Sequence, residues 1–208
     1  MNRKISRKEL FHSLFSSFRD VGEHFAPAPA LEPRRLLRPP GAPLPDGDYL
    51  SACTGCADCV PVCPKGAILI AAADEASDKR VAVILPERAP CALCTELPCI
   101  AACPEGALLP LDSPRQVRMG VAQVNPRRCR TFHGEACDLC LRFCPLPEEA
   151  IRFIGGRPVV VPSVCTGCGM CAAVCPERPR AVVVVPEREL IPGVRLPLYP
   201  PGAEPPRG

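Results

Sequence analysis

The residues of this chain whose type and spacing could carry out chemistry are its 16 cysteines. They form four groups of four, and each group ends in a Cys-Pro pair. The first and fourth groups have the spacing x2-x2-x3, the second x2-x4-x3 and the third x7-x2-x3. The groups are Cys53, Cys56, Cys59 and Cys63; Cys91, Cys94, Cys99 and Cys103; Cys129, Cys137, Cys140 and Cys144; and Cys165, Cys168, Cys171 and Cys175. Because no cysteine is left over, we expect a fourfold internal repeat that uses every thiol.

The run C-x2-C-x2-C-x3-C-P is the pattern that binds a [4Fe–4S] cluster in bacterial two-cluster ferredoxins. Three thiolates on one tight loop can hold three corners of the cluster, and a distant segment supplies the fourth sulfur. Gly55 and Gly167, each between the first two ligands of its group, can bring the backbone close to the cluster. The second and third groups keep the x3-Cys-Pro ending. We therefore predict four [4Fe–4S] clusters, with all the cysteines as metal and cofactor ligands.

Other uses of the cysteines fit the spacing less well. A structural zinc site usually places two cysteine pairs far apart, whereas here three ligands crowd into a short loop. A disulfide framework needs an oxidising compartment, and thiols this close together are poorly placed for several bridges. His133, inside the long gap of the third group, is interpreted as a surface residue rather than a ligand. Because no catalytic triad, phosphate loop or dinucleotide motif is found, we expect no catalytic residues and a chain that is not catalytic alone.

Composition and charge argue against nucleic acid as a partner and against a membrane-spanning helix. Aromatic residues make up only 4% of the chain, and the formal net charge is +3. This charge is too small, and the basic residues too scattered, to indicate a nucleic-acid surface. No run of about 18 apolar residues exists, which argues against a membrane-spanning helix. Each oxidised cluster with its four thiolates adds about −2, so the loaded chain would carry roughly −5 and be complementary to a basic redox partner.

The segments between the cysteine groups predict an α+β fold. Five β-branched runs are short enough to be strands, at 67–71, 81–85, 117–124, 158–161 and 181–185. The end of each cysteine group suits one or two helical turns. We expect tandem two-cluster ferredoxin-like modules with short helices and short strands, all within residues 46–185. Our prediction pairs the first group with the fourth and the second with the third, and pairing of consecutive groups is the alternative.

The flanks of this four-cluster domain differ from it in composition. Residues 1–25 predict an amphipathic helix that packs on its own domain, docks to a partner or binds a membrane surface. Residues 26–45 predict a proline-rich linker, and residues 186–208 a proline-rich C-terminal tail. The apolar positions of the helix are Leu10, Phe11, Leu14, Phe15, Phe18, Val21 and Phe25.

The order of the four motifs, together with the LRPPGA segment at 37–42, resembles the ferredoxin-type proteins of the MauM/NapG and NapF kind. The resemblance covers about residues 36–185. It implies four [4Fe–4S] clusters and a role in relaying electrons to or within a respiratory or periplasmic oxidoreductase system. Only the cysteines carry over from it residue by residue.

The N-terminus departs from exported members of this group. The segment Ser6-Arg7-Lys8-Glu9-Leu10-Phe11 is similar to a twin-arginine signal, but Lys8 replaces the second arginine. The apolar stretch expected next is interrupted by Arg19 and Asp20, although APAPA at 26–30 could imitate a cleavage site. We expect a cytoplasmic protein, with periplasmic export as the alternative.

Four one-electron centres in one chain predict an electron carrier or an electron-transfer subunit. Its partners would be a redox donor and a separate catalytic acceptor subunit, with membrane association only through a partner or the N-terminal helix. The alternative is an iron–sulfur assembly or accessory protein that docks on a partner redox enzyme. A zinc-binding scaffold is a third, weaker hypothesis.

Overall fold

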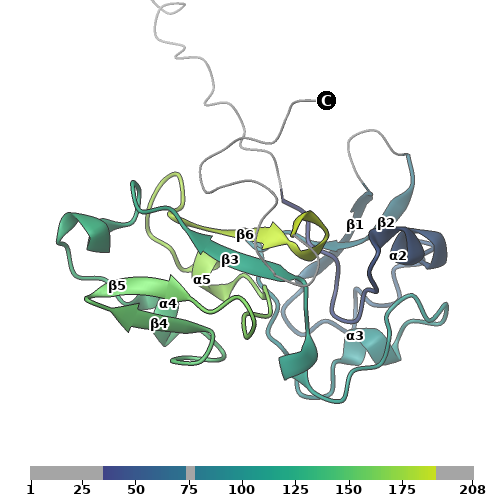
Figure 1. The fold of residues 1–208 in the computed structure, drawn as a ribbon. Helices are drawn as coiled ribbons and strands as arrows, with labels where there is room; N and C mark the ends of the chain where they lie inside the picture. The colour runs from purple at the N-terminus through teal and green to yellow at the C-terminus, as the bar shows by residue number, and fades with distance from the viewer. Residues whose placement is uncertain (1–34, 74–77, 191–208) are drawn as a thin grey trace, which may run out of the picture. The chain divides into compact units, whose positions relative to one another are not determined.

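The computed structural model describes residues 35–73 and 78–190. The predicted N-terminal helix, the twin-arginine-like segment and the first part of the proline-rich linker lie outside the described residues, as does most of the C-terminal tail. The described part contains short helices and three two-stranded antiparallel sheets (Figure 1), which agrees with the expected mixture of short helices and short strands. None of its helices has the length and apolar character needed to cross a membrane.

The first half of this region is built around one hairpin. Strand β1 (Ile68–Ala72) pairs with β2 (Arg80–Ile84), and Ile68 lies opposite Ile84. Leu37 exchanges two backbone hydrogen bonds with Ile84, at 2.8 and 2.9 Å, so the chain before the first cysteine group covers the free edge of β2. Helix α2 (Asp46–Ala52) then leads into Cys53. The hairpin therefore connects the first cysteine group to the second.

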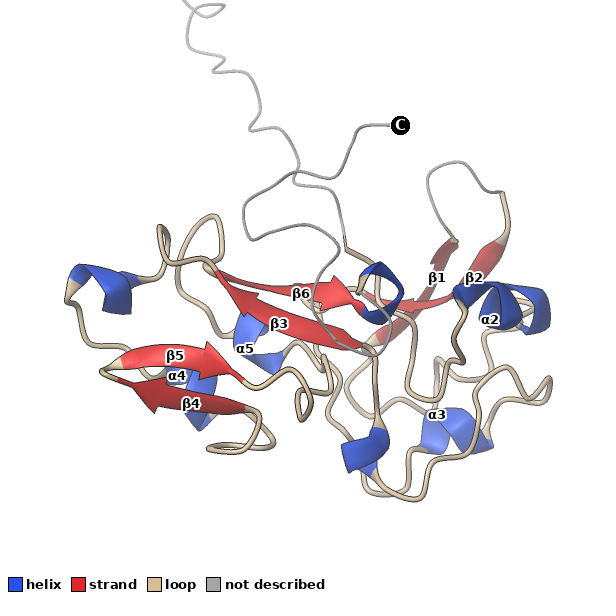
Figure 2. Cartoon of the chain, viewed as in Figure 1, coloured by secondary structure: helices blue, strands red, loops and turns tan. Residues whose placement is uncertain are grey.

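The second half has two strand pairs. Strand β3 (Gly120–Val124), which precedes the third cysteine group, pairs with β6 (Val182–Pro186), which follows the fourth. Between these groups, β4 (Ile151–Ile154) and β5 (Arg157–Val160) form a hairpin that turns at two glycines (Figure 2). The third and fourth groups are thus enclosed by one strand pair and joined by another.

One-turn helices lie in the last part of the cysteine groups as predicted, except in the first group. Helix α3 (Pro98–Ala101), α4 (Leu139–Arg142) and α5 (Met170–Ala173) each contain the third cysteine of their group. In the first group the corresponding residues form hydrogen-bonded turns only. Three short 3-10 helices complete the described elements, namely η1 (Pro114–Gln116), η2 (Arg130–His133) and η3 (Glu187–Glu189).

All five predicted strand runs overlap an observed strand, but the sequence interpretation omitted β4. Only Ile151 of that strand is buried, and its neighbour Arg152 is exposed. A four-residue strand with one buried position and a charged neighbour does not stand out from a loop. The missing strand matters because it completes the hairpin over the later cysteine groups.

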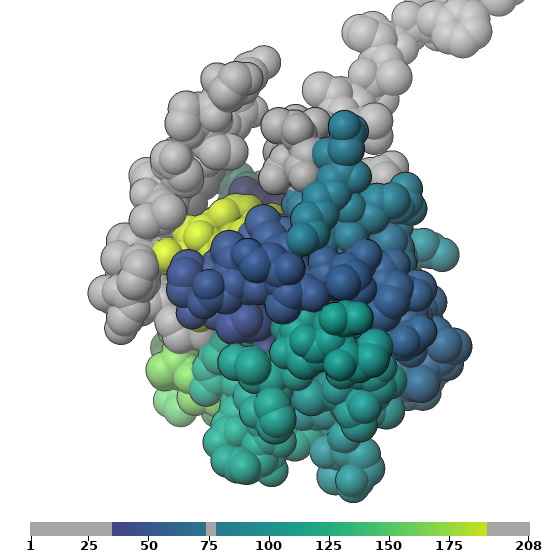
Figure 3. All heavy atoms as spheres, turned by 90° about the vertical axis from the view of Figure 1, so that its right-hand side faces the viewer, coloured from purple at the N-terminus to yellow at the C-terminus, as the bar shows by residue number. Residues whose placement is uncertain are grey.

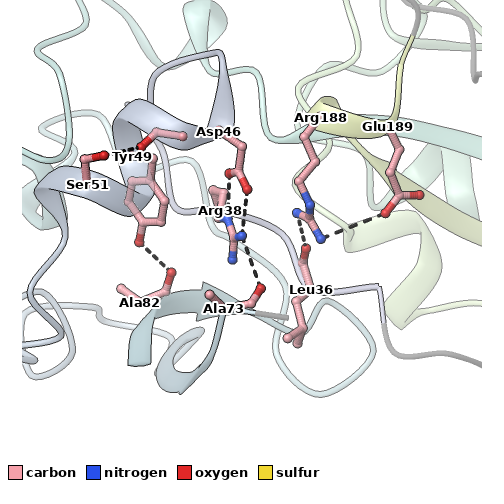
Figure 4. A network of polar contacts seen from close by, with 10 residues as sticks. Leu36, Arg38, Asp46, Tyr49, Ser51, Ala73, Ala82, Arg188 and Glu189 are labelled. Carbon is pink, nitrogen blue, oxygen red and sulfur yellow. Dashed lines mark hydrogen bonds and ion pairs between the residues drawn. The ribbon is translucent and has the colours of Figure 1, made fainter. Parts of the chain in front are cut away.

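Polar contacts attach the segment before the first cysteine group to the core (Figure 4). The Arg38 guanidinium donates two hydrogen bonds of 2.8 Å to the Asp46 carboxylate and one of 3.2 Å to the Ala73 carbonyl oxygen. Tyr49 is buried, and its hydroxyl donates a 2.6 Å hydrogen bond to the Ala82 carbonyl oxygen. The Asp46 pKa is lowered, because the hydrogen bonds and charge of Arg38 outweigh the upward effect of burial.

The same segment also meets the second cysteine group. The Leu109 N–H donates a 2.7 Å hydrogen bond to the Gly41 carbonyl oxygen. Figure 3 shows the blue residues of the early chain lying directly on teal residues that follow the second group. Pro39 and Pro40 are fully buried there. This part of the predicted proline-rich linker therefore packs against the core.

Candidate metal centres

Three cavities in the described region are each lined by four cysteines. In each cavity, three cysteines come from one group and the fourth is the last cysteine of a neighbouring group. Site A is lined by Cys53, Cys56, Cys59 and Cys103. Site B is lined by Cys63, Cys91, Cys94 and Cys99, and site D by Cys144, Cys165, Cys168 and Cys171. Twelve of the predicted ligand residues are thus brought together in sets of four.

The remaining four cysteines form site C by the same rule. Burial and then the neighbouring thiols of Cys137 and Cys129 together raise the pKa of Cys140 to about 12, so these three side chains lie close together. Cys175 is buried, and its sulfur accepts a 3.3 Å hydrogen bond from the Ala181 N–H. We assign Cys175 to site C because it is the last cysteine of the group that shares a module with the third.

The predicted pairing of cysteine groups is wrong. Cys103, not Cys175, completes the cavity of the first group, and Cys144, not Cys63, completes that of the fourth. Consecutive groups therefore exchange their last cysteines, which was the alternative. The physical reason is connectivity. One short antiparallel hairpin joins the two groups of each pair, so the chain reverses direction and the second group lies beside the first. The similar spacing of the first and fourth groups does not indicate which groups a hairpin joins.

The cysteine sets do not converge on a point. Among residues 35–73 and 78–190, no three or more Cys, His, Asp or Glu side chains are placed to hold a single metal ion. A zinc ion would need its ligands about 2.0–2.3 Å from one centre. Four thiols around a cavity suit instead a cage of several iron and sulfide atoms. The residues present therefore fit a [4Fe–4S] group.

Burial favours the protonated form of several of the cysteine thiols. It raises the pKa of Cys59, Cys99 and Cys168 to about 11 and that of Cys91 to about 12. Cluster ligands bind as thiolates, so loading each site must release protons. The attraction of the metal must then compensate for the unfavourable burial of the thiolate charge.

Backbone N–H groups point at several of the sulfurs. The Ala67 N–H donates to Cys63 at 3.3 Å, and the Ala122 N–H donates to Cys165 at 3.5 Å. The Leu93 N–H similarly donates to Cys91 at 3.5 Å. Hydrogen bonds of this kind stabilise negative charge on sulfur and help to set the reduction potential of a bound cluster. Sites B and D thus carry local groups that can tune an electron carrier.

The two glycines between first and second ligands have the same environment in both modules. Gly55 (φ 74°) and Gly167 (φ 73°) lie in the left-handed region. A Cβ on Gly55 would lie 2.6 Å from the Arg80 carbonyl oxygen, and one on Gly167 would lie 2.5 Å from that of Gly120. The neighbouring strand therefore leaves no room for a side chain at either position. Both glycines also line the cysteine cavities, as expected from the sequence, Gly55 that of site A and Gly167 that of site D.

Thr166 contacts a predicted ligand, and sequence reasoning missed it. Thr166 is only 3% exposed. Its side chain forms a hydrogen bond that lowers the pKa of Cys168 and so favours the thiolate, against the larger upward effect of burial. Thr54 occupies the same position in the first group but is exposed. The sequence Cys-Thr-Gly-Cys is identical at the two places, so only the tertiary structure distinguishes them. His133, by contrast, is exposed as predicted, with Nε2 3.1 Å from the Arg127 carbonyl oxygen.

The four sites form a connected series. Cys59 of site A and Cys99 of site B influence each other electrostatically, as do Cys171 of site D and Cys140 of site C. Between the modules, the Cys91 N–H donates a 2.9 Å hydrogen bond to the Cys168 carbonyl oxygen. The order of neighbours is therefore A, B, D, C.

Comparison with known proteins agrees with this arrangement. Residues 52–107 and residues 122–176 each match a 4Fe-4S dicluster domain, and each match contains one pair of consecutive groups. The methylamine utilization ferredoxin-type protein MauM of Methylorubrum extorquens is 40% identical over 166 residues, which cover 75% of this chain and 74% of the relative. The chain belongs to the ferredoxin-type iron–sulfur proteins of the MauM and NapG kind.

Two further relatives support the same family. MauM of Paracoccus denitrificans is 39% identical over 73% of this chain and 72% of the relative. The ferredoxin-type protein NapG of Escherichia coli is 35% identical over 72% of this chain and 70% of the relative. The chain therefore carries 4Fe-4S clusters in two dicluster domains and has an iron–sulfur electron-transfer role in an oxidoreductase system.

Proposed function

We propose that this protein relays electrons one at a time through four [4Fe–4S] clusters, in the order A, B, D, C or its reverse, between a donor protein and a separate catalytic subunit. The observation that carries the proposal is the 2.9 Å hydrogen bond between Cys91 and Cys168, which joins a ligand of site B to a ligand of site D. A bound [4Fe–4S] cluster gains or loses one electron at a time. Because the two modules are in direct contact, electrons can pass from the clusters of one module to those of the other.

The residues of the chain supply binding and insulation rather than bond chemistry. Four thiols bind each cluster, and backbone N–H groups stabilise charge on the sulfurs. Apolar side chains such as Ile68, Ile84 and Leu97 line site B together with its cysteines. A dry surrounding protects a cluster from solvent and contributes to its potential. These roles match an electron carrier.

The proposal is tested on the full chain reconstituted with iron and sulfide under anaerobic conditions. We expect iron and acid-labile sulfide equal to four clusters per chain, and a redox titration followed by electron paramagnetic resonance in which four centres each take one electron. Neighbouring reduced centres should show magnetic interaction. Iron for two clusters or fewer, or four centres without any magnetic interaction, would contradict the relay.

Two substitutions and a control assign the ligands in the same experiment. Cys59→Ala in site A and Cys171→Ala in site D should each remove one cluster, because each deletes a predicted ligand. His133→Ala serves as the control, since that residue lies within the third group but is exposed. Unchanged iron content in both cysteine variants would show that the assignment is wrong.

A further inference from the structure

The β4–β5 hairpin has two chemically different faces. Side chains alternate along each strand, and paired residues of antiparallel strands point to the same side. Ile151 pairs with Val160, and both line the cavity of site D. The opposite face consists of four exposed residues, which are Arg152, Ile154, Arg157 and Val159. The inner face therefore belongs to the cluster site, while the outer face is exposed among residues 35–73 and 78–190.

The outer face alternates basic and apolar residues. Arg152 lies opposite Val159, and Ile154 lies opposite Arg157. Ile154 is 62% exposed, the highest value for a large apolar side chain in the described part of the protein, and Val159 is 41% exposed. Each arginine thus lies directly beside an apolar residue that has no cover within residues 35–73 and 78–190.

The two arginines are held in position but keep hydrogen-bonding capacity. The Arg157 guanidinium lies 5.1 Å from the centre of the Phe132 ring, and Arg152 Nε donates a 2.9 Å hydrogen bond to the Glu148 carbonyl oxygen. Neither forms an ion pair with a carboxylate of the described residues, whereas the exposed Arg115 is paired with Glu149. A guanidinium has five N–H donors arranged to fit a carboxylate. Both side chains can therefore bind an acidic group of a partner.

The corresponding hairpin of the first module does not have this property. In β2, Val81, Ala82, Val83 and Ile84 are all buried, and Leu37 covers the edge of the strand. The exposed outer face is therefore specific to the second module. The hairpin covers site D, and η2 and α4, which belong to the group that forms site C, pack against β5 and β4.

We propose that the outer face of the β4–β5 hairpin is the docking surface for a redox protein whose own face carries carboxylates around an apolar centre. This inference rests on the proposed relay. Protein interfaces are enriched in arginine, whereas segments that bind a membrane surface place Trp, Phe or Leu beside their basic residues, and Trp and Tyr gather at membrane interfaces. The four residues include arginine and aliphatic side chains only. A basic patch on a chain that is acidic when loaded would also orient an acidic partner toward this face.

Docking here places the partner close to a cluster. Only the hairpin separates the outer face from site D, because Ile151 and Val160 of the same strands line that cavity. A partner on this face could therefore exchange an electron with site D across a single layer of backbone. The electron lost by the donor is the one gained by the cluster, and no bond is made or broken.

Reduced flavodoxin, an acidic one-electron donor, serves as the probe. Binding of oxidised flavodoxin to the oxidised, cluster-loaded full chain is measured by titration calorimetry at low and high salt, and electron transfer is measured by stopped flow. The double variant Arg152→Glu/Arg157→Glu should weaken binding and slow the bimolecular rate by about tenfold or more at low salt. Ile154→Ser should weaken binding with little change in its salt dependence.

Arg88→Glu and Leu109→Ser are the matched controls, because both residues are exposed and lie outside the second module. Equal losses in the hairpin variants and the controls would overturn the proposal. The proposal would also be overturned if the wild type bound phosphatidylglycerol vesicles and the hairpin variants did not, because the face would then bind a membrane surface. A wild-type dimer that the variants dissociate in sedimentation would overturn it as well, by assigning the face to a second copy.

The iron content and resonance spectrum of each variant separate this inference from the relay itself. If the wild type contains its clusters and dithionite reduces them, but the hairpin variants bind flavodoxin normally, only the docking surface is wrong. If the wild type lacks the clusters, the relay is wrong.

Discussion

The Cys91 N–H donates a 2.9 Å hydrogen bond to the carbonyl oxygen of Cys168, which connects a ligand loop of the first module directly to one of the second. Adjacent contacts support this junction. Gly169 (φ 85°) lies so close to Pro86 that a Cβ would collide with it, and Arg180 donates a 3.3 Å hydrogen bond to the Glu87 carbonyl oxygen. The two dicluster domains therefore meet at the loops that bind their clusters.

The junction predicts that Gly169→Ala weakens communication between sites B and D. The added Cβ would collide with Pro86 and move the loop that carries Cys168. We expect a smaller magnetic interaction between these two centres in the fully reduced protein, measured by electron paramagnetic resonance. Gly66→Ala is the control, since Gly66 also has positive φ (56°) but open space around it. Equal spectra for the two variants would contradict the junction.

The exchange of last cysteines predicts different effects for Cys103→Ser and Cys175→Ser. Cys103 lines site A, so Cys103→Ser should disrupt the cluster bound by the first group and leave that of the fourth intact. Cys175→Ser should instead disrupt the cluster of the third group. Iron analysis with resonance spectra of both variants checks the assignment. Loss of the first-group signal in Cys175→Ser would restore the pairing of the first group with the fourth.

Backbone conformation predicts that Ala57→Gly stabilises the protein. Ala57 has φ 74°, which costs an L-residue about 1–2 kcal/mol, whereas glycine raises the entropy of the unfolded chain by about 0.4–1 kcal/mol. The net gain should be about 0.5–1 kcal/mol, seen as a higher midpoint of anaerobic thermal unfolding. The control Ala101→Gly, at an exposed position of α3, should lower the midpoint. A lower midpoint for Ala57→Gly would refute the argument.

The ion pair of Arg38 and Asp46 predicts a large loss of stability for Asp46→Asn. Their side chains are 9% and 19% exposed, so the substitution leaves a shielded guanidinium without its carboxylate and should cost about 2–3 kcal/mol. Arg115→Gln, which breaks a pair with side chains 59% and 50% exposed, should change stability little. Chemical denaturation of the loaded protein under anaerobic conditions measures both.

The pH dependence of this difference follows from the lowered pKa of Asp46. A carboxyl group with a lowered pKa stabilises the fold fully above its unfolded value of 3.8, and the contribution is lost only as the pH falls through the folded value. The difference in unfolding free energy between wild type and Asp46→Asn should therefore be the same at about pH 6 and pH 9. A marked change across that interval would show that another group controls the pair.

Much of the candidate site could be predicted from residues close together in the chain. Three ligands of each cluster lie in one short loop, so the spacing of Cys53, Cys56 and Cys59 is sufficient to indicate the type of cofactor. The β-branched runs also located β1, β2, β3, β5 and β6, because short strands are formed by local apolar patterns. Strand β4 was missed because burial of Ile151 depends on the cavity it lines.

The sequence by itself was sufficient to indicate the kind of cluster and the family, and to predict the set of ligand residues. Only the tertiary structure decided which group completes which site, where the two modules touch and which Cys-Thr-Gly-Cys threonine is buried. The reason is that a fourth ligand such as Cys103, and a contact such as that of Cys91 with Cys168, depend on how hairpins return the chain through space. The spacing of cysteines along the chain predicts the local loop that binds three ligands. It does not predict which distant segment the fold brings next to that loop.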